Sequence, residues 1–302
     1  MYHNPALLLP TLQGLNINPN GVYADCTFGG GGHSRSILKA LNENGQLLAF
    51  DHDSDAVSQL PIDARLKFIP LNFKYLLKGM RLHGVEKLDG ILADLGVSFH
   101  QFDTADRGFS IRFDGPLDMR MNKAQSLTAA EVLNKYSEEE LTTVFWKYGE
   151  LEQSRKVARK VVEYRSQAAF ETTFQLVKFL EPFQPFKRRA AFLARAFQAL
   201  RIVVNSELEA LENLLEASLT ALKPGGRLVV ISYHSLEDRM VKHFMREGSL
   251  HGEAKRDAFG KRFLQFELIG RKAIEATEEE IALNPRSRSA KLRIAERNDH
   301  WK

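Results

Sequence analysis

Cysteine and long hydrophobic runs are the scarcest features of this chain of 302 residues. The single cysteine, Cys26, excludes a disulfide framework and any metal site built from several thiolates, and it suits a reducing compartment. The apolar run at Ala6 to Leu9 ends at Pro10 and is too short for the core of a signal peptide, and no other segment reaches a membrane-spanning length. We therefore expect a cytoplasmic protein without a membrane segment.

The net charge is only +4, but it is unevenly distributed along the chain. Between Arg155 and Arg201 there are 11 lysines and arginines against three glutamates, so this stretch carries +8 and the rest of the chain −4. The same stretch contains Tyr164, Phe170, Phe174, Phe179, Phe183, Phe186, Phe192 and Phe197. Cations and stacking rings suit a nucleic-acid surface, whereas phenylalanines at helical spacing suit a hydrophobic core with a solvated charged face. Both interpretations stay open.

The first third of the chain alternates between apolar strands and helical stretches. Strands are expected at Val22–Cys26, Leu47–Asp51, Leu66–Pro70 and Asp89–Asp94. Helices are expected between them, at Ser34–Leu41, Asp55–Leu60 and Tyr75–Leu82. This alternation predicts an α/β fold with a doubly wound, mostly parallel sheet.

The alternation then stops and resumes near the C-terminus. Residues 95–117 are rich in Gly, Asp and Phe, and residues 126–222 have a helical pattern, which predicts an all-helical insertion. The sheet is expected to resume after a turn at Lys223–Gly226, with strands at Arg227–Ser232, Phe263–Ile269 and Ala290–Ala295. We therefore divide the chain into a sheet domain of residues 1–115 and 201–302 and a helical insertion of residues 116–200.

A run of four glycines follows the first expected strand, in the sequence Asp25-Cys-Thr-Phe-Gly-Gly-Gly-Gly-His-Ser34. A glycine turn that leads into a helix lets a ligand approach the backbone amides of the helix N-terminus, which predicts a site for an adenosine-containing cofactor. In the dinucleotide-binding register Ser34 or Arg35 would occupy the position of the third glycine, so the turn fits that fingerprint poorly. Asp25, four residues before Gly29, resembles the first motif of class I methyltransferases instead.

Two further acidic residues end expected strands. Asp51 follows Gly32 by 19 residues, the separation at which a carboxylate accepts hydrogen bonds from ribose hydroxyls. Asp94 ends the fourth strand and should face the carboxyl edge of the sheet, where it is either the leading candidate for a catalytic carboxylate or a turn-capping residue. Metal binding at Asp51-His52-Asp53 is not expected, because no further ligand spacing supports it.

His234 and Ser235 follow the restored strand closely, and both could contact a target nucleotide. No Gly-x-Ser-x-Gly sequence surrounds Ser235, so a hydrolase is not indicated. Ser235 is equally suited to cap the following helix. The segment Asp106–Met121 is expected to form an ordered loop, either over the cofactor or target base or as a purely structural loop.

From Asp94 onward the chain carries several motifs that together are highly specific. They include Asp94-Leu-Gly-Val-Ser98, Asp106-Arg-Gly-Phe-Ser110, Asp114-Gly-Pro-Leu-Asp-Met-Arg-Met121, Val204-Asn-Ser-Glu-Leu208 and Ser232-Tyr-His-Ser-Leu-Glu-Asp-Arg239. In these segments, and over nearly its whole length, the chain resembles the bacterial 16S ribosomal RNA cytosine-N4 methyltransferases.

The resemblance implies a class I methyltransferase sheet with a helical insertion that recognises RNA. It implies methylation of the exocyclic N4 amine of a cytidine in the decoding region of 16S rRNA, within the small (30S) ribosomal subunit, with S-adenosylmethionine as donor. The cofactor contacts implied by motif position are Gly31, Gly32, His33, Asp51, Phe73, Asp94 and Gln101. Substrate contacts are expected from His234, Ser235, Arg195 and Arg201, and a homodimer stays open.

The chain also departs from the family pattern. Pro10 stands where the family usually has Glu, Phe99 replaces a Ser, and Phe102 replaces a Leu. Residues 191–194 replace polar residues that commonly precede the arginine at Arg195. Three alternatives stay open: a methyltransferase with another acceptor, a nonenzymatic RNA-binding assembly factor, and a dehydrogenase.

Overall fold

The computed structural model describes residues 5–184, 188–252, 254, 260 and 262–298. Within it the chain forms two compact units. Unit 1 comprises residues 1–96 and 208–302, and unit 2 comprises residues 97–207. Among the described residues, no helix is both long and apolar enough to cross a membrane.

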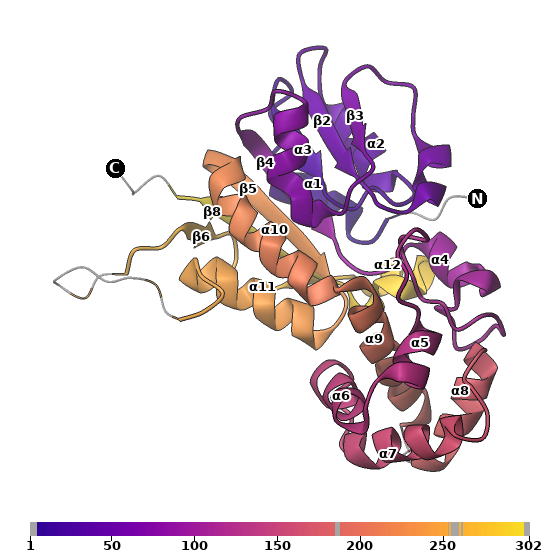
Figure 1. Cartoon of the computed structure of the whole chain (residues 1–302). Helices are drawn as coiled ribbons and strands as arrows, with labels where there is room; N and C mark the ends of the chain where they lie inside the picture. The colour runs from indigo at the N-terminus through magenta and orange to yellow at the C-terminus, as the bar shows by residue number, and fades with distance from the viewer. Residues whose placement is uncertain (1–4, 185–187, 253, 255–259, 261, 299–302) are drawn as a thin grey trace. The chain divides into compact units, whose positions relative to one another are not determined.

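Among the described residues, unit 1 contains an eight-stranded sheet with the strand order β3-β2-β1-β4-β5-β8-β6 (Figure 1). The eighth strand, β7, pairs with β8. The strands are β1 (Val22–Asp25), β2 (Gln46–Phe50), β3 (Leu66–Ile69), β4 (Leu88–Asp94), β5 (Leu222–Ser232), β6 (Phe266–Leu268), β7 (Ile274–Glu275) and β8 (Lys291–Arg297). β1 to β5 pair in parallel, and β8 is antiparallel to both β5 and β6. A single reversed strand inside an otherwise parallel sheet is the class I methyltransferase arrangement, so the predicted fold class is confirmed.

Apolar side chains cover both faces of this sheet, as β5 illustrates. Leu228 and Val230 point into one hydrophobic cluster, whereas Val229 and Ile231 point into another on the opposite face. Alternate residues of a strand face opposite sides, so a strand buried on both sides must be apolar throughout. The helices of unit 1 that supply these clusters and the adjoining turns are α1 (Leu8–Leu15), α2 (Gly32–Ala40), α3 (Leu76–Leu82), α10 (Glu207–Ala221), α11 (Ser235–Glu247) and α12 (Glu278–Leu283).

Some elements of unit 1 differ from the prediction. The helix expected at Asp55–Leu60 is a 3-10 helix, η1 (Ser54–Gln59), and a second one, η2 (Phe73–Tyr75), precedes α3. β5 begins at Leu222, so residues 223–226 lie within the strand rather than in a turn before it. The short strand β7 was not predicted, since two residues are too few to show a period of alternation.

Unit 2 consists of helices around a separate hydrophobic core. Its helices are α4 (Phe99–Asp103), α5 (Ala129–Lys135), α6 (Glu138–Thr143), α7 (Ser154–Arg165), α8 (Thr173–Leu180) and α9 (Arg189–Asn205), with 3-10 helices η3 (Ala105–Arg107) and η5 (Glu181–Phe183) and a π-helix, η4 (Val144–Tyr148). This unit spans 97–207 rather than the expected 116–200. The boundary moves toward the N-terminus because Val97, Phe102 and Phe109 pack in the helical core.

The phenylalanines of the basic stretch are mostly core residues. Phe170, Phe183, Phe192 and Phe197 are buried, and Phe179 packs edge-on against Phe170 with 5.1 Å between ring centroids. A surface of stacking rings is therefore wrong for these positions, because the helical spacing directs them inward. Phe174 is exposed, and Phe186 lies outside the described residues.

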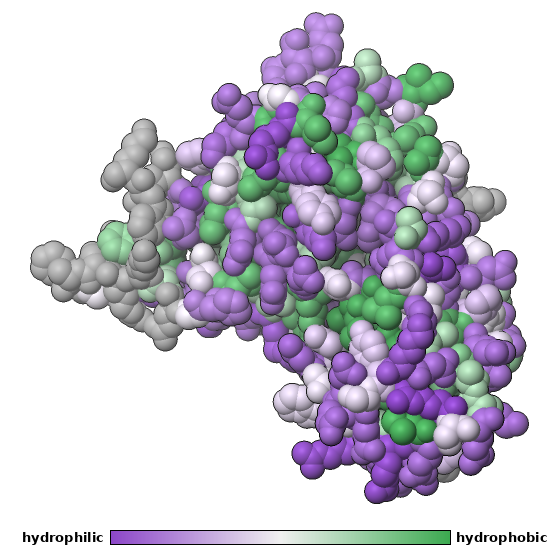
Figure 2. Space-filling model, viewed as in Figure 1, coloured by the Kyte–Doolittle hydropathy of each residue, from purple (hydrophilic) through white to green (hydrophobic). Residues whose placement is uncertain are grey.

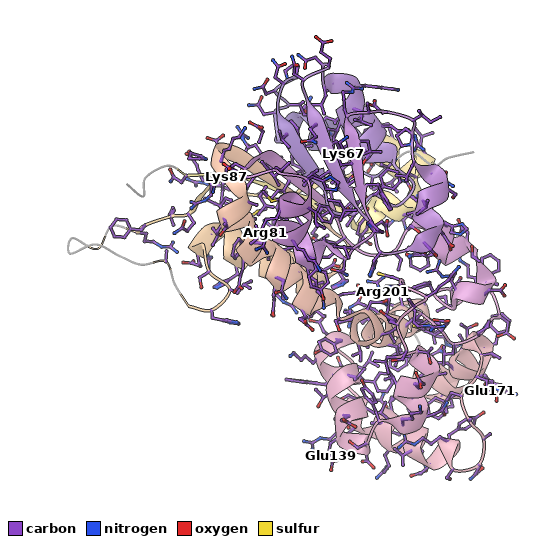
Figure 3. The ribbon with its side chains drawn as sticks, turned by 45° about the horizontal axis from the view of Figure 1, so that its top comes forward. Lys67, Arg81, Lys87, Glu139, Glu171 and Arg201 are labelled. Carbon is purple, nitrogen blue, oxygen red and sulfur yellow. The ribbon has the colours of Figure 1, made fainter. Side chains whose placement is uncertain are left out.

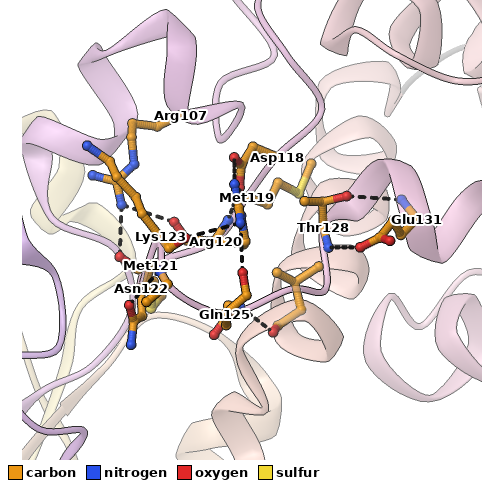
Figure 4. A network of polar contacts seen from close by, with 12 residues as sticks. Arg107, Asp118, Met119, Arg120, Met121, Asn122, Lys123, Gln125, Thr128 and Glu131 are labelled. Carbon is orange, nitrogen blue, oxygen red and sulfur yellow. Dashed lines mark hydrogen bonds and ion pairs between the residues drawn. The ribbon is translucent and has the colours of Figure 1, made fainter.

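Hydrogen bonds between side chains and backbone groups order the loop at residues 106–121 (Figure 4). Arg107 is buried and donates through Nη2 to the carbonyls of Arg120 and Met121, at 3.0 and 2.9 Å. Asn205, at the end of α9, accepts from the Met121 N–H at 2.7 Å and donates to the Met119 carbonyl at 2.8 Å. Two motifs that are distant in the sequence thus hold each other in place within unit 2.

Candidate active site

The parallel strands of unit 1 bring one polar or aromatic side chain each to the carboxyl edge of the sheet. These residues are Asp25 from β1, Asp51 after β2, Phe73 after β3, Asp94 from β4 and Tyr233 after β5. Ligands of open α/β sheets bind at this edge, where the strand order reverses. Here the reversal lies between β1 and β4, which are neighbours.

The glycine turn joins β1 to α2 in a conformation that requires glycine. Gly31 is the N-cap of α2 with φ 74°, and a Cβ at this position would lie 2.7 Å from Cζ of Phe28. At Gly32 a Cβ would lie 3.0 Å from Cγ and Cδ of Pro5. Gly31 is therefore required by the packing of the turn itself, whereas a Cβ at Gly32 would need only a small shift of the Pro5 ring. The sequence pattern had attributed both glycines to close approach of a ligand, and that contact stays a prediction.

Asp25 stabilises the glycine turn through hydrogen bonds. Its carboxylate is 1% exposed and accepts hydrogen bonds from Ser34 Oγ at 2.6 Å and from the Thr27 N–H at 3.0 Å. Burial raises the pKa of Asp25, and these hydrogen bonds oppose the rise. The role of Asp25 is therefore to fix the glycine turn against the start of α2.

Asp51 connects the glycine turn to the loop after β2. Its Oδ2 accepts from the Gly29 N–H and its Oδ1 from the Asp53 N–H, both at 2.8 Å. Burial raises the pKa of Asp51 to about 6. Each carboxylate oxygen has two acceptor positions, so both oxygens keep capacity to accept hydroxyl hydrogens from a ribose.

Asp94 occupies the centre of the edge. Its N–H donates to Thr27 Oγ1 at 2.7 Å, its Oδ1 accepts from the Tyr233 hydroxyl at 2.8 Å, and its Oδ2 lies 3.6 Å from His33 Nδ1. Burial raises the pKa of Asp94 to about 7; the Tyr233 hydrogen bond lowers it, and the negative charges of Asp25 and Glu237 raise it further. A carboxylate in this state can accept a hydrogen bond or a proton near neutral pH.

His33, in the first turn of α2, is buried and neutral. Its Nε2 lies 3.2 Å from the carbonyl oxygen of Ala6. Burial lowers the pKa of His33 to about 4. Because a carbonyl only accepts, Nε2 carries the proton, and Nδ1 presents a lone pair toward Asp94.

The remaining predicted cofactor residues lie in different units. Phe73, in unit 1, is half-buried at the start of η2, where the Asn72 side chain accepts from the Lys74 N–H at 2.9 Å. Gln101 belongs to unit 2 and forms a capping box at α4, with its Oε1 accepting from the Ser98 N–H at 2.9 Å. Cofactor contact by Gln101 stays a prediction.

The predicted substrate residues have structural partners of their own. His234, rather than Ser235, is the N-cap of α11: its Nδ1 accepts from the Glu237 N–H at 3.4 Å, and its Nε2 lies 3.2 Å from Glu237 Oε1. The capping role expected for Ser235 is therefore wrong, since the helix starts one residue earlier than a Ser cap requires. Substrate contact by either residue stays a prediction.

The two predicted arginines differ in their surroundings within unit 2. Arg195 is exposed on α9. Arg201, labelled in Figure 3, forms a largely buried bidentate pair with Glu207, with distances of 2.8 and 2.9 Å. An arginine held in this way at the end of a helix contributes to the fold of the unit, and its contact with substrate stays a prediction.

Sequence reasoning missed Tyr233 as a site residue. It was quoted only as part of the motif that begins at Ser232. The signal that could have found it is its place directly after a buried strand, the same position that singled out Asp51. Its hydroxyl donates to Asp94, which lies 139 positions away in the sequence, and no local pattern shows such a contact.

Cys26 is expected to take no part in the chemistry of this edge. Its side chain is 2% exposed, and burial raises the pKa of its thiol well above the ordinary value. Cys26→Ala is expected to keep kcat within about twofold and to lower stability by about 1 kcal/mol, the scale of a small cavity. A methyl-transfer assay and thermal melting check this; a thousandfold loss of kcat with a folded protein would instead mean a thiol-dependent reaction.

The residues at the edge fit an adenosine-containing sulfonium cofactor. The N-cap Gly31 has no side chain to cap α2, so the first N–H groups of the helix suit a carboxylate. Asp51 suits the ribose hydroxyls. The acidic edge formed by Asp51 and Asp94 also suits a cationic ligand better than an anionic one, because both carboxylates would be repelled by added negative charge.

Comparison with known proteins shows the family to which the chain belongs. The model of the MraW methylase family matches residues 1–298. The chain belongs to this family. Its relatives include proteins named ribosomal RNA small subunit methyltransferase H: that of Bacteroides thetaiotaomicron is 52% identical over 98% of this chain and 97% of its own, and that of Cytophaga hutchinsonii is 51% identical over 98% of this chain and 100% of its own.

The matching solved structures are much more distant in sequence. A putative rRNA methylase from Clostridium thermocellum is 11% identical with a TM-score of 0.44, covering 98% of this chain and 100% of its own. A putative methyltransferase from Streptococcus mutans in complex with SAH is 12% identical with a TM-score of 0.40, covering 98% of this chain and 99% of its own. As a member of the methylase family, the chain is a methyltransferase.

Proposed function

We propose that this methyltransferase transfers a methyl group from S-adenosylmethionine to the N4 amine of a cytidine in small-subunit ribosomal RNA. The names of its relatives, at 51–52% identity over almost the full chain, support the rRNA acceptor. The observation that carries the choice of an amine is Asp94, a partly exposed carboxylate at the carboxyl edge whose Oδ1 is held by the Tyr233 hydroxyl and whose pKa lies near 7. A group of this kind accepts the hydrogen of an attacking amine.

The N4 amine of cytidine is a weak nucleophile because its lone pair is delocalised into the ring. Bound at the edge, S-adenosylmethionine supplies an electrophilic methyl group. Asp94 then has two tasks: its Oδ2 orients the amine by accepting one hydrogen, and it favours the lone pair at nitrogen as the new bond forms. Methylation at a ring carbon is disfavoured, because it would need an attacking thiolate and the only thiol, Cys26, is buried.

The helical unit offers a surface for RNA on α7. This helix exposes Arg155, Lys156, Arg159 and Lys160, and in the described part of the chain Glu163 pairs with Arg159 and Lys160. In Figure 2 the surface around α7 is dominated by hydrophilic side chains. Exposed cations at helical spacing suit the phosphates of an RNA strand.

Neutralising this face is expected to weaken RNA binding. For the double variant Arg155→Gln and Arg159→Gln, we expect affinity for 16S rRNA to fall and the slope of log Kd against log salt to decrease by about 1.5, since each phosphate contact contributes about 0.7–0.9. Fluorescence anisotropy at several salt concentrations measures both quantities.

A matched control uses Arg81→Gln with Lys87→Gln. Both residues are labelled in Figure 3 and belong to unit 1, where Lys87 precedes β4 at the amino edge of the sheet. This variant removes the same charge and should leave affinity and slope unchanged. Equal slopes for both double variants and the unchanged protein would show that α7 is only a solvated face.

We further propose that the substrate is the RNA within the 30S subunit, which places the enzyme in the cytoplasm where ribosomes assemble. Unit 2 would serve as the RNA-recognition part. Light scattering of the purified protein tests whether it forms a homodimer.

The function is tested by incubating the protein and labelled S-adenosylmethionine with unmodified 30S subunits and with free 16S rRNA. Nuclease digestion and mass spectrometry then locate the methyl group. Label on N4 of one cytidine supports the proposal. Transfer to another acceptor would show that the substrate is not this cytidine. Cofactor binding without any transfer would favour an RNA-binding assembly factor.

A further inference from the structure

Tyr233 is joined to the proposed reaction centre through a single hydrogen bond. It follows β5 directly, and its hydroxyl donates to Asp94 Oδ1 at 2.8 Å. β4 and β5 are parallel neighbours, with Asp94 paired to Ile231. Their side chains therefore meet at the carboxyl edge by register.

Tyr233 is held by a backbone hydrogen bond and by apolar packing of its ring. Its backbone N–H donates to Glu237 Oε2 at 3.0 Å, and its ring packs against the apolar cluster on the α1 and α2 face of the sheet. The hydroxyl is thus presented to Asp94 by a side chain with little freedom to move.

The other groups around Asp94 give its carboxylate no hydrogen. His33 is neutral and faces Oδ2 with a lone pair, and the nearby Asp25 and Glu237 are acidic. Among the described residues, only Tyr233 donates a hydrogen bond to the Asp94 carboxylate. The remaining oxygen, Oδ2, is the one left to meet a substrate.

We propose that Tyr233 is a positioning residue for methyl transfer, which holds Oδ1 of Asp94 so that Oδ2 stays ionised and directed at the substrate amine. This inference rests on the proposed function. In the step it supports, the amine nitrogen bonds to the methyl carbon, and the electron pair of the broken carbon–sulfur bond remains on sulfur. One N–H proton passes to Oδ2 and then to solvent.

The role has a pH signature. Burial, Asp25 and Glu237 raise the pKa of Asp94, and the Tyr233 hydrogen bond lowers it; His33 stays neutral above a pKa of about 4. Since the active form is the carboxylate, activity is present above the pKa of Asp94 and lost as pH falls through it. Removing the hydroxyl therefore shifts the acid limb of the rate profile to higher pH. Burial and the charges of Asp94, Glu237 and Glu280 hold the pKa of Tyr233 itself well above 10, so it remains a donor throughout.

The test is the pH dependence of kcat for full-length Tyr233→Phe, with Tyr23→Phe as the control. Tyr23 is a buried tyrosine of the same sheet whose hydroxyl accepts from the Asn18 N–H at 2.7 Å. For Tyr233→Phe we expect kcat at pH 7 to fall about fivefold and to recover above about pH 9, because raising the pKa of Asp94 from about 7 by about one unit lowers its ionised fraction at pH 7 from about one half to about one eleventh. KM for S-adenosylmethionine should change little. Tyr23→Phe should keep the acid limb where it is.

A pH-independent loss of kcat, or no loss, in Tyr233→Phe would overturn the proposal. A direct titration of the Asp94 carboxyl by carbon-13 NMR separates this result from failure of the proposed function. A higher pKa for Asp94 in the variant supports the positioning role of Tyr233 even if no cytidine is methylated. An unchanged pKa contradicts that role even if methylation is confirmed.

Discussion

Asp94→Asn is expected to lower kcat for methyl transfer by at least about 100-fold, the scale of losing a group that takes part in proton transfer. Affinity for S-adenosylmethionine should fall far less, by about threefold or under, because the glycine turn and Asp51, which are predicted to contact the cofactor, are unchanged. Isothermal titration and single-turnover kinetics measure the two quantities separately. If the variant kept both its kcat and its affinity for S-adenosylmethionine, Asp94 would be a turn-capping residue.

The same substitution is expected to stabilise the protein at neutral pH. The pKa of Asp94 is about 7 in the folded protein and about 3.9 in an unfolded chain, so the folded state binds more protons between these values. Stability from this group is therefore lost as pH rises from 4 to 7. Asparagine carries no charge to bury, and its amide can face the lone pair of His33. Thermal melting at pH 7 should show a higher Tm.

Asp89→Asn is the matched control, because Asp89 lies near the opposite end of β4. Its Oδ2 accepts from the Val22 N–H at 2.7 Å and from Lys223 Nζ at 2.8 Å. This variant should lower Tm and leave kcat unchanged. A lower Tm for Asp94→Asn as well would contradict the assignment of Asp94 as a group kept charged at a cost in stability.

Gly31→Ala is expected to lower affinity for S-adenosylmethionine by at least about tenfold, equivalent to about 1.4 kcal/mol. The backbone at Gly31 has φ 74°, where a Cβ is strained by about 1–2 kcal/mol, and this Cβ would also lie 2.7 Å from Phe28 Cζ and 2.9 Å from Arg35 Nη1. The turn must therefore shift, which displaces the N–H groups at the start of α2. Equilibrium titration with the cofactor measures the loss.

Gly84→Ala separates strain from the displacement of the turn. Gly84 has φ 67°, and a Cβ there would meet nothing within 4 Å. Both variants should lose stability by a similar strain energy, but only Gly31→Ala should lose cofactor affinity. Equal affinities for the two variants would show that the turn does not hold the cofactor.

Local sequence patterns were sufficient for much of unit 1. The alternation of strands and helices predicted the parallel sheet, and the residues that end strands predicted Asp51 and Asp94 at its carboxyl edge. These predictions succeeded because strand burial and turn chemistry are encoded by neighbouring residues. The aromatic residues of the basic stretch were ambiguous, since their spacing fits either a core or a binding surface, and only packing placed Phe170 and Phe197 inside.

The sequence by itself thus determined the fold class, the family and the acidic residues of the candidate site. The tertiary structure decided what surrounds them: Tyr233 beside Asp94, the Ala6 carbonyl that sets the tautomer of His33, and the packing that places residues 97–115 in unit 2. The physical reason is that ionisation and hydrogen bonding depend on side chains from separate elements. Their meeting is fixed by strand order and register, which no local pattern contains.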